Sequence, residues 1–289
     1  MKTARFLWYP ARSLGLLAFL VACLAGCATS DGDGDVQVCG FFGLEAVAFD
    51  AWRDRANEGR AAPTIRGYTY EPLRIDRADR PVLSGYKLSL QKQETAPRAL
   101  LFLQGNAMRT VQLRHKLTFF ADRGFDVFVF DYRGYGGSDG VPLLEPTSLD
   151  QADIADFVND QGYEQTYLYG ISIGGIYAMS PHMPRDAFDA IAVDSSPAEL
   201  PWYSFCPTEY DPISNVPVDA ANLLVLSGGL DKIVPAADVA PLGKAVEGGG
   251  TYIHGAEFGH PLSDGARNTQ QRFSIVVEFF NRTSGTTPP

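Results

Sequence analysis

The sequence predicts an α/β fold, with a mostly parallel central sheet that helices cover on both faces. Short apolar runs of strand length alternate with longer segments of helical periodicity, which is typical of this class. The runs are apolar almost throughout, as expected of parallel strands that are buried on both faces. A glycine follows two of the helical segments, which is a common helix stop signal. We expect parallel strands at 99–103, 127–130, 166–169, 190–193 and 223–226.

The remaining elements follow from the same periodicities. Residues 86–93 alternate between apolar and polar and should pair antiparallel at an edge of the sheet. Residues 45–60 have the pattern of an additional N-terminal helix. We expect the main helices at 109–123, 148–161 and 268–281.

Composition and charge exclude several classes of protein. The chain has 289 residues, of which 45% are hydrophobic and 20% charged, so it can bury a core and is not intrinsically disordered. It contains 24 Lys and Arg against 34 Asp and Glu, for a net charge of −10, without a long basic run. Nucleic acid is therefore not an expected partner. The sequence leaves the oligomeric state open.

The first 26 residues have the pattern of an export signal. Lys2, Arg5 and Arg12 precede the uncharged apolar stretch 13–26, which is too short for an ordinary membrane-spanning helix. The stretch ends in Leu24-Ala-Gly-Cys27, which resembles the lipobox of bacterial lipoproteins. That resemblance implies cleavage before Cys27, lipidation of Cys27 and a location in the bacterial cell envelope, on the periplasmic side of the outer membrane.

The expected mature chain is one domain on a short tether. Loss of residues 1–26 removes three positive charges, so the net charge becomes −13 and the lipid supplies the attraction to the membrane. Cys39 and Cys206 would then meet an oxidising compartment, where they either form a disulfide or remain two separate buried thiols. The predicted boundaries are 27–40 for the lipidated Cys and tether, 41–282 for the domain, 195–222 for a short lid and 283–289 for a disordered tail.

The pattern G-x-S-x-G occurs twice and offers two nucleophile candidates. Ser172 lies between a predicted strand and a helix-like segment, as a nucleophile elbow requires, because the sharp turn exposes the hydroxyl. Ser138 is followed instead by Val-Pro-Leu-Leu-Glu-Pro at 141–146, which we do not expect to begin a helix. Ser172 is therefore the predicted nucleophile, and Ser138 is interpreted as a turn residue.

The segment 130–138, Phe-Asp-Tyr-Arg-Gly-Tyr-Gly-Gly-Ser, together with the elbow at Ser172, resembles the α/β-hydrolases. The similarity is strongest to the serine-hydrolase branch of BEM46-like proteins and serine aminopeptidases, and it covers about residues 65–281. It implies an α/β-hydrolase fold with a short lid and a triad in the chain order Ser, Asp or Glu, His. Such a site needs no metal or organic cofactor.

The catalytic base must be one of four histidines. His115 and His182 do not follow the expected chain order, and His254 directly follows a strand-like segment. His260 lies in the loop before the last helix, where the resemblance places the base. His260 is the predicted base, and His254 is the alternative.

The segment from Leu223 through Asp231 to Pro235 resembles the family's strand, acid loop and closing proline, so the resemblance implies Asp231 as the acid. It would fix the imidazole tautomer and stabilise the imidazolium ion. Asp194, at the end of the preceding strand, is the alternative, because some relatives carry the acid at that place.

The resemblance also implies an oxyanion hole. Its donors would be the backbone N–H of Ile173 and one from the loop 104–108, from Asn106 or alternatively Ala107. In this loop Gln104 replaces the usual His, which leaves the loop's shape open. Two charged residues, Asp131 and Arg133, are expected to form a buried structural pair and not to act in catalysis.

The predicted lid is short and aromatic, which favours modest apolar acyl groups or exposed ester and thioester bonds. Tyr210 also lies in the lid, and the alternative is that these aromatic side chains fill the edge of the core. The expected pocket residues are Met108, Trp202, Tyr203 and Phe205.

The sequence thus predicts a membrane-tethered serine hydrolase that cleaves small carboxylic ester or thioester substrates, a carboxylesterase. An aminopeptidase or an acyltransferase on the same fold remains open, because a triad alone does not separate them. A noncatalytic envelope interaction protein is the alternative of a different class, suggested by Gln104.

Overall fold

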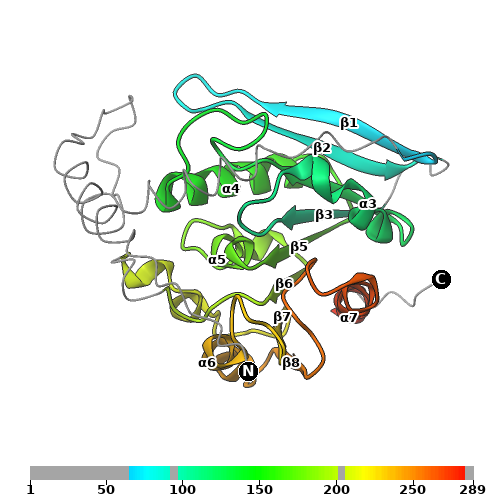
Figure 1. The fold of residues 1–289 in the computed structure, drawn as a ribbon. Coiled ribbons are helices and arrows are strands. Elements are labelled where there is room, and N and C mark those ends of the chain that lie inside the picture. The colour runs from blue at the N-terminus through cyan, green and yellow to red at the C-terminus, as the bar shows by residue number, and fades with distance from the viewer. Residues whose placement is uncertain (1–64, 92–96, 201–205, 284–289) are drawn as a thin grey trace, which may run out of the picture.

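The computed structural model describes residues 65–91, 97–200 and 206–283. Eight strands form one sheet in the order β1-β2-β4-β3-β5-β6-β7-β8 (Figure 1). The strands are β1 Tyr68–Ile75, β2 Leu83–Leu90, β3 Arg98–Leu103, β4 Phe125–Phe130, β5 Gln165–Ile171, β6 Ala190–Asp194, β7 Leu223–Gly228 and β8 Thr251–Gly255. The helices are α3 Thr110–Ala121, α4 Leu144–Asn159, α5 Ile173–Ala178, α6 Ala236–Val246 and α7 Ala266–Thr283. Short 3₁₀ turns cover Arg185–Ala187, Thr208–Tyr210 and Pro212–Asn215.

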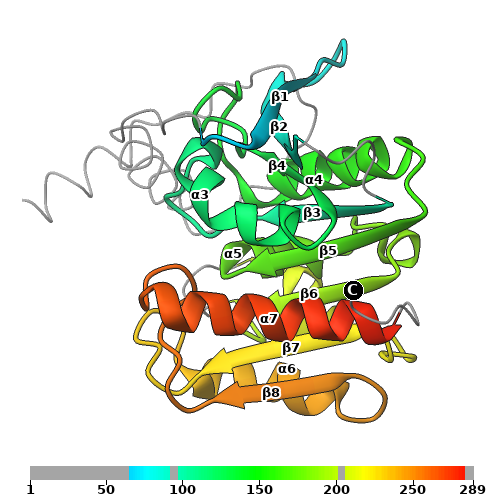
Figure 2. The same cartoon turned by 90° about the vertical axis from the view of Figure 1, so that its right-hand side faces the viewer.

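The sheet is parallel from β4 through β3, β5, β6 and β7 to β8. Only β2 and β1 run antiparallel, β2 to β4 and β1 to β2. The carboxyl ends of the parallel strands therefore lie at one edge of the sheet, where the arrowheads gather in Figure 2. Ligand and active sites of open α/β sheets form at this edge.

Helices cover both faces of the sheet and divide the core into two clusters. α4, α5 and α6 bury side chains such as Ile154, Ile176 and Val239 against one face. α3 and α7 pack on the other face, where Leu113 and Phe273 are buried (Figure 2). This arrangement confirms the predicted fold class, because continuous apolar strands require cover on both sides.

The strand at the β1 side of the sheet differs from the prediction. The alternating strand, here β2, is not an edge strand, since it pairs with both β1 and β4. The edge is β1, which the sequence did not indicate because only Ile75 of its eight residues is buried. A strand that buries so little apolar surface carries a weak hydrophobic pattern.

Two helices also differ from the prediction, and both contain proline. α4 begins at Leu144, so the expectation that 141–146 cannot lead into a helix was wrong. Pro146 falls in the first turn, where a backbone N–H has no intrahelical acceptor in any case. α6 was not predicted; Pro241 lies inside it, and Val239, Leu242 and Val246 bury one face of this helix.

The predicted export signal and tether, at 1–26 and 27–40, lie outside the described residues, as does the helix expected at 45–60. Within the described ranges, no helix has both the length and the apolar character needed to span a bilayer.

We predict that Phe280→Ala destabilises the domain by about 3–5 kcal/mol, the usual cost of removing a buried Phe side chain. Phe280 is fully buried on α7, and its ring stacks on Tyr167 of β5 with centroids 4.6 Å apart. Urea unfolding measures the difference. Val218→Ala is the control, because Val218 is fully exposed and its truncation should change stability by less than about 0.5 kcal/mol. Equal stability of the two variants would contradict this account of how α7 is held.

Candidate active site

Ser172 occupies a strained turn between β5 and α5. Its backbone has φ 54° and ψ −121°, a conformation that residues with a side chain rarely adopt. The turn is held on one side by the hydrogen bond from Ser172 N to the carbonyl of Asp194, 2.9 Å long. The strand, the strained serine and the helix together have the geometry that a nucleophile elbow requires.

Close backbone contacts explain the two glycines of the elbow. A Cβ added to Gly170 would lie 2.4 Å from the carbonyl oxygen of Gly174. A Cβ added to Gly174 would lie 2.2 Å from the carbonyl oxygen of Leu103, at the end of β3. Both positions therefore need glycine, and α5 rests directly against the end of β3 and the start of the loop that follows it.

Asp231 and His260 meet at the carboxyl edge of the sheet. Asp231 lies in the loop after β7, His260 lies in the loop between β8 and α7, and both side chains are buried. His260 Nδ1 and Asp231 Oδ2 are 2.8 Å apart, a hydrogen-bond distance. The bond leaves Nε2 as the ring nitrogen that can accept a proton.

The Asp231 carboxylate is held by three donors. Its Oδ1 accepts hydrogen bonds from the backbone N–H groups of Ile233 and Val234, both 2.9 Å long. Burial by itself raises the pKa of Asp231, but the hydrogen bonds from His260 and these two N–H groups outweigh it, and the net pKa is lowered. Asp231 is therefore a stable anion that can orient an imidazole.

No hydrogen bond joins the Ser172 hydroxyl to the His260 ring within the part of the chain that the structure describes. Hydrogen bonds between nucleophile and base are often long or poorly aligned in free enzymes and tighten when substrate binds. The contact between these two side chains stays a prediction, while the Asp231 to His260 contact is observed.

The alternative acid and base have other partners. Asp194 is fully buried and accepts hydrogen bonds from Arg272 and from the hydroxyl of Tyr169. His254 Nδ1 lies 2.9 Å from the hydroxyl of Ser227. His115 is on α3, and His182 Nε2 lies 3.3 Å from the hydroxyl of Tyr210. Of the candidate pairs, the structure brings together Asp231 and His260.

The loop after β3 contains two candidate oxyanion donors, the backbone N–H groups of Asn106 and Ala107. The N–H of Ala107 donates to Asn106 Oδ1 at 2.8 Å, so the alternative oxyanion donor is already occupied. The hydroxyl of Tyr135 donates to the same oxygen at 2.7 Å and fixes the Asn106 side chain. Within the described chain, the backbone N–H groups of Asn106 and Ile173 make no hydrogen bond, as an oxyanion hole requires.

Gln104 anchors this loop from inside the protein. The side chain is fully buried, and its Nε2 donates to the carbonyl of Phe130 at 2.8 Å. The Tyr132 hydroxyl donates to the backbone carbonyl of Gln104 at 2.5 Å. Gln104 thus ties the ends of β3 and β4 together and supports the loop at the position where the resemblance implies a His.

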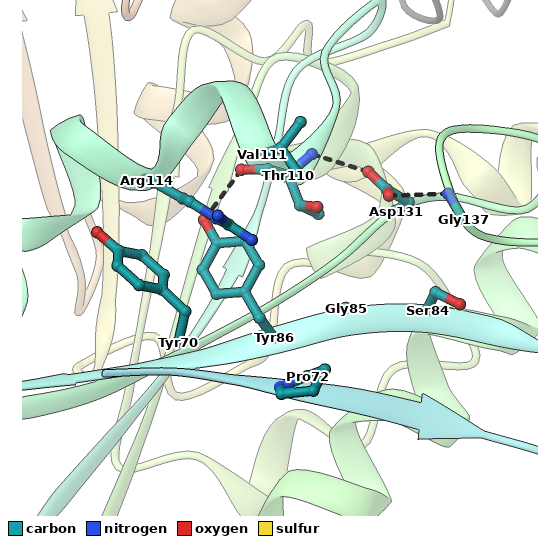
Figure 3. Close-up of a pocket in the computed structure, with 10 residues that line it drawn as sticks. All are labelled: Tyr70, Pro72, Ser84, Gly85, Tyr86, Thr110, Val111, Arg114, Asp131 and Gly137. Atoms are coloured by element: carbon teal, nitrogen blue, oxygen red, sulfur yellow. Dashed lines mark hydrogen bonds between the residues drawn. The ribbon is translucent and has the colours of Figure 1, made fainter. Parts of the chain in front are cut away.

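Asp131 and Arg133 have structural roles, but the ion pair found for Arg133 is with another residue. Asp131 accepts hydrogen bonds from the N–H groups of Thr110, at 2.7 Å, and Gly137, at 3.2 Å (Figure 3). Burial raises the pKa of Asp131, although these two hydrogen bonds oppose the shift. Arg133 instead donates two hydrogen bonds to Asp150, 2.6 and 2.8 Å long.

Ser138 is a turn residue, but the reason is its hydrogen bonds and not the absence of a following helix. Its Oγ donates to the carbonyl of Asp131 at 2.7 Å and accepts from the N–H of Ser84 at 2.9 Å. The hydroxyl is therefore engaged in joining the turn to β2.

Few of the predicted pocket residues can be placed. Met108 and Ser172 both lie next to Gly105, since a Cβ there would be 3.7 Å from both the Met108 sulfur and Ser172 Cβ. Tyr210 is buried in the core, so for this residue the alternative of a core-filling aromatic holds. Residues outside the described ranges are Trp202, Tyr203, Phe205, Cys27 and Cys39, and the bridge to Cys206 stays a prediction.

The fold is that of the α/β-hydrolases, and the buried Asp231–His260 pair lies at the same edge of the sheet as the strained turn at Ser172. The sequence profile of the family described as serine aminopeptidase, S33 (Hydrolase_4), matches residues 95–213. This segment includes the oxyanion loop, the elbow and Asp194, and it ends before Asp231 and His260.

Several known proteins resemble this chain in sequence or in fold. An uncharacterized membrane protein of Saccharomyces cerevisiae is 27% identical over 157 residues, which is 52% of this chain and 54% of that protein. The chain therefore spans about half the length of this relative. Protein bem46 of Schizosaccharomyces pombe is 26% identical over 208 residues, 64% of this chain and 68% of bem46. Esterase 2 of Thermogutta terrifontis, solved as phosphoramylated by tabun, shares the fold with a TM-score of 0.60 and 17% identity, covering 80% of this chain and all of the esterase.

We predict that the contribution of Asp231 to the free energy of unfolding decreases as the pH falls from 5 to 3. Because its pKa is lowered on folding, the anion stabilises the fold fully above the unfolded pKa of about 3.9, and this contribution is lost as pH falls through the folded value. The difference in unfolding free energy between wild type and Asp231→Asn should therefore be larger at pH 5 than at pH 3. Urea titrations at both pH values measure it, and a difference independent of pH would contradict the assignment.

Proposed function

We propose that this chain is a serine hydrolase that cleaves carboxylic ester or thioester bonds through an acyl-enzyme on Ser172. The observation that carries the proposal is the hydrogen bond between buried His260 and Asp231 at the sheet edge that also holds the strained elbow of Ser172. A nucleophile, a base and an orienting carboxylate in this order are the parts that acyl transfer requires.

In the proposed first step, Ser172 Oγ attacks the acyl carbonyl and its proton passes to His260 Nε2. Asp231 holds the ring through Nδ1 and stabilises the positive charge that forms. The carbonyl oxygen becomes an oxyanion, to which the N–H groups of Ile173 and Asn106 donate. His260 then gives its proton to the leaving oxygen or sulfur as the bond to the acyl carbon breaks.

Deacylation repeats the sequence with water. His260 takes a proton from the attacking water, the acid product leaves, and the proton returns to Ser172. The donors of the oxyanion hole act on both tetrahedral intermediates, and each such donor is worth about 3–4 kcal/mol of transition-state stabilisation.

Ester substrates are favoured over amides by two considerations. The first is that the solved structures that share this fold include several esterases. In addition, the described part of the lid is short, with only 3₁₀ turns at Thr208–Tyr210 and Pro212–Asn215, and so suits small acyl groups. The matched family is described as serine aminopeptidase, which makes release of N-terminal residues the second candidate.

We also propose that lipid on Cys27 tethers the enzyme to the bacterial envelope, at the periplasmic face of the outer membrane. The sequence Leu24-Ala-Gly-Cys27 after a charged and then apolar segment supports this proposal. The net charge of −13 expected after cleavage would be repelled by anionic lipid, so a lipid anchor must supply the attraction.

We predict that Ser172→Ala lowers kcat for short acyl esters by about 10⁴-fold or more, as loss of a triad nucleophile does elsewhere. A fluorophosphonate probe should label wild type and fail to label this variant. Ser138→Ala is the matched control, because Ser138 belongs to the other G-x-S-x-G sequence and should keep its labelling.

The same assay separates the other functions. A series of p-nitrophenyl esters from acetate to decanoate, run beside aminoacyl amides, ranks esterase against aminopeptidase activity. Faster turnover of aminoacyl amides would replace the esterase proposal with the aminopeptidase. Absence of labelling in folded wild type would overturn catalysis and favour a noncatalytic envelope protein.

We predict that the full chain, expressed in a bacterial host fed an alkyne fatty acid, carries the label and sediments with membranes. Cys27→Ser should lose both properties, since the Cys27 thiol that is expected to accept the lipid is absent from this variant. Cys23→Ser is the control and should keep both, because Cys23 lies within the expected signal. Label retained in Cys27→Ser would refute the assignment of the anchor.

A further inference from the structure

Arg272 is the most deeply buried cation outside the proposed triad among the residues described. It lies on α7, and its side chain is 1% exposed. A buried guanidinium is costly unless it is paired and hydrogen-bonded. The partners of Arg272 therefore indicate which groups this buried guanidinium holds in place.

The partners of Arg272 come from two segments of the active site. Nη1 donates to Asp194 Oδ1 at the end of β6, and Nη2 donates to the carbonyl of Gly259. Nε lies 3.5 Å from Asp264 Oδ2. The guanidinium also lies over the ring of Phe258, 4.5 Å from its centroid. Gly259 directly precedes His260 in the chain.

Both backbone groups of Gly259 are fixed by this cluster. Its carbonyl accepts from Arg272, and its N–H donates to Asp264 Oδ2 at 3.0 Å. The position of the residue before the base is thus set by charged side chains and not by loop packing alone. Gly228 leaves the space required, because a Cβ there would lie 2.8 Å from both Arg272 Nη2 and the Gly259 carbonyl oxygen.

Asp194 connects the cluster to the nucleophile. Its carboxylate binds Arg272, and its backbone carbonyl accepts the hydrogen bond from Ser172 N. The carboxylate is held further by Tyr169 at 3.0 Å and Ser195 at 3.2 Å. Burial raises the pKa of Asp194, and Arg272 opposes this shift most strongly. One path of direct contacts therefore runs from the elbow through Asp194 and Arg272 to Gly259.

We propose that Arg272 is a positioning residue of the active site, which sets the distance between Ser172 and His260 by bridging Asp194 and the Gly259 carbonyl. The inference rests on the proposed function for its effect on turnover, but its effect on the His260 ring does not depend on it. The geometry of a nucleophile and its base is sensitive, since a displacement of about 1 Å can cost about 100-fold in rate.

A purely structural ion pair predicts a different outcome. If Asp194 and Arg272 only neutralised each other, removing both charges together would restore stability and rate alike. If Arg272 positions the base, the double variant recovers stability but not rate, because the Gly259 carbonyl still lacks its donor. Asp194→Asn combined with Arg272→Met tests this difference.

The test compares Arg272→Met, Arg272→Lys and the double variant with Arg98→Met. Arg98 is a matched control, since it is also buried, donates to a side chain and a backbone carbonyl, and lies over a ring, Phe125. Its side-chain partner, Asn281, lies near the end of α7 away from the His260 loop. Urea unfolding establishes conditions in which each variant is fully folded.

For Arg272→Met we expect kcat to fall about 100-fold, with KM changed less than about threefold, and the fluorophosphonate labelling rate to fall in parallel. Arg272→Lys should recover part of the rate, because one ammonium can reach Asp194 or Gly259 but not both in the geometry of a guanidinium. Arg98→Met should keep wild-type kcat. Wild-type kcat in folded Arg272→Met, or equal loss in Arg98→Met, would overturn the proposal.

A second readout is independent of turnover. The proton shared by His260 Nδ1 and Asp231 should give a downfield NMR signal, which we expect to shift or broaden in Arg272→Met and to stay unchanged in Arg98→Met. An unchanged signal in Arg272→Met overturns the positioning role even if the protein proves inactive. If the signal shifts in Arg272→Met but no serine probe labels the wild-type protein, the positioning role stands and the proposed hydrolase function is rejected.

Discussion

The arrangement of the site depends on one close approach, between Gly174 and the carbonyl of Leu103. No Cβ fits between them, so α5 can rest against the end of β3 only through glycine. That contact brings the strained Ser172 turn next to the loop that carries Asn106. The parallel sheet then adds Asp231 and His260 at the same edge, although 88 residues separate Ser172 from His260 in the chain.

Local pattern was sufficient to predict most of the fold. The five apolar runs all became parallel strands, because strands covered on both faces show a continuous signal. Errors arose where that signal is weak or ambiguous. β1 buries a single residue and left no pattern. Pro146 argued against a helix start, but it lies in the first turn of α4, where the backbone N–H is dispensable. The helix that contains Pro241 was not predicted.

The site was predictable to the same extent that it follows chain order. Asp231 and His260 were indicated by their place after particular strands, and the structure has them in contact. Sequence alone gave no sign of Arg272, which occupies an ordinary position in an amphipathic helix and whose partner Asp194 is 78 residues away. The supporting bonds of Gln104 were equally hidden, because they join it to Phe130 and Tyr132, 26 and 28 positions along the chain.

The place of Arg272 in the chain has a consequence for the order of synthesis. α7 comes after all other elements that the structure describes, yet its Arg272 joins Asp194, next to the Ser172 turn, to Gly259 in the loop that carries His260. A chain that ended before this helix would contain Ser172, Asp231 and His260 without that bridge. During synthesis, Arg272 can therefore join Asp194 and Gly259 only after α7 has been made and has docked on the sheet.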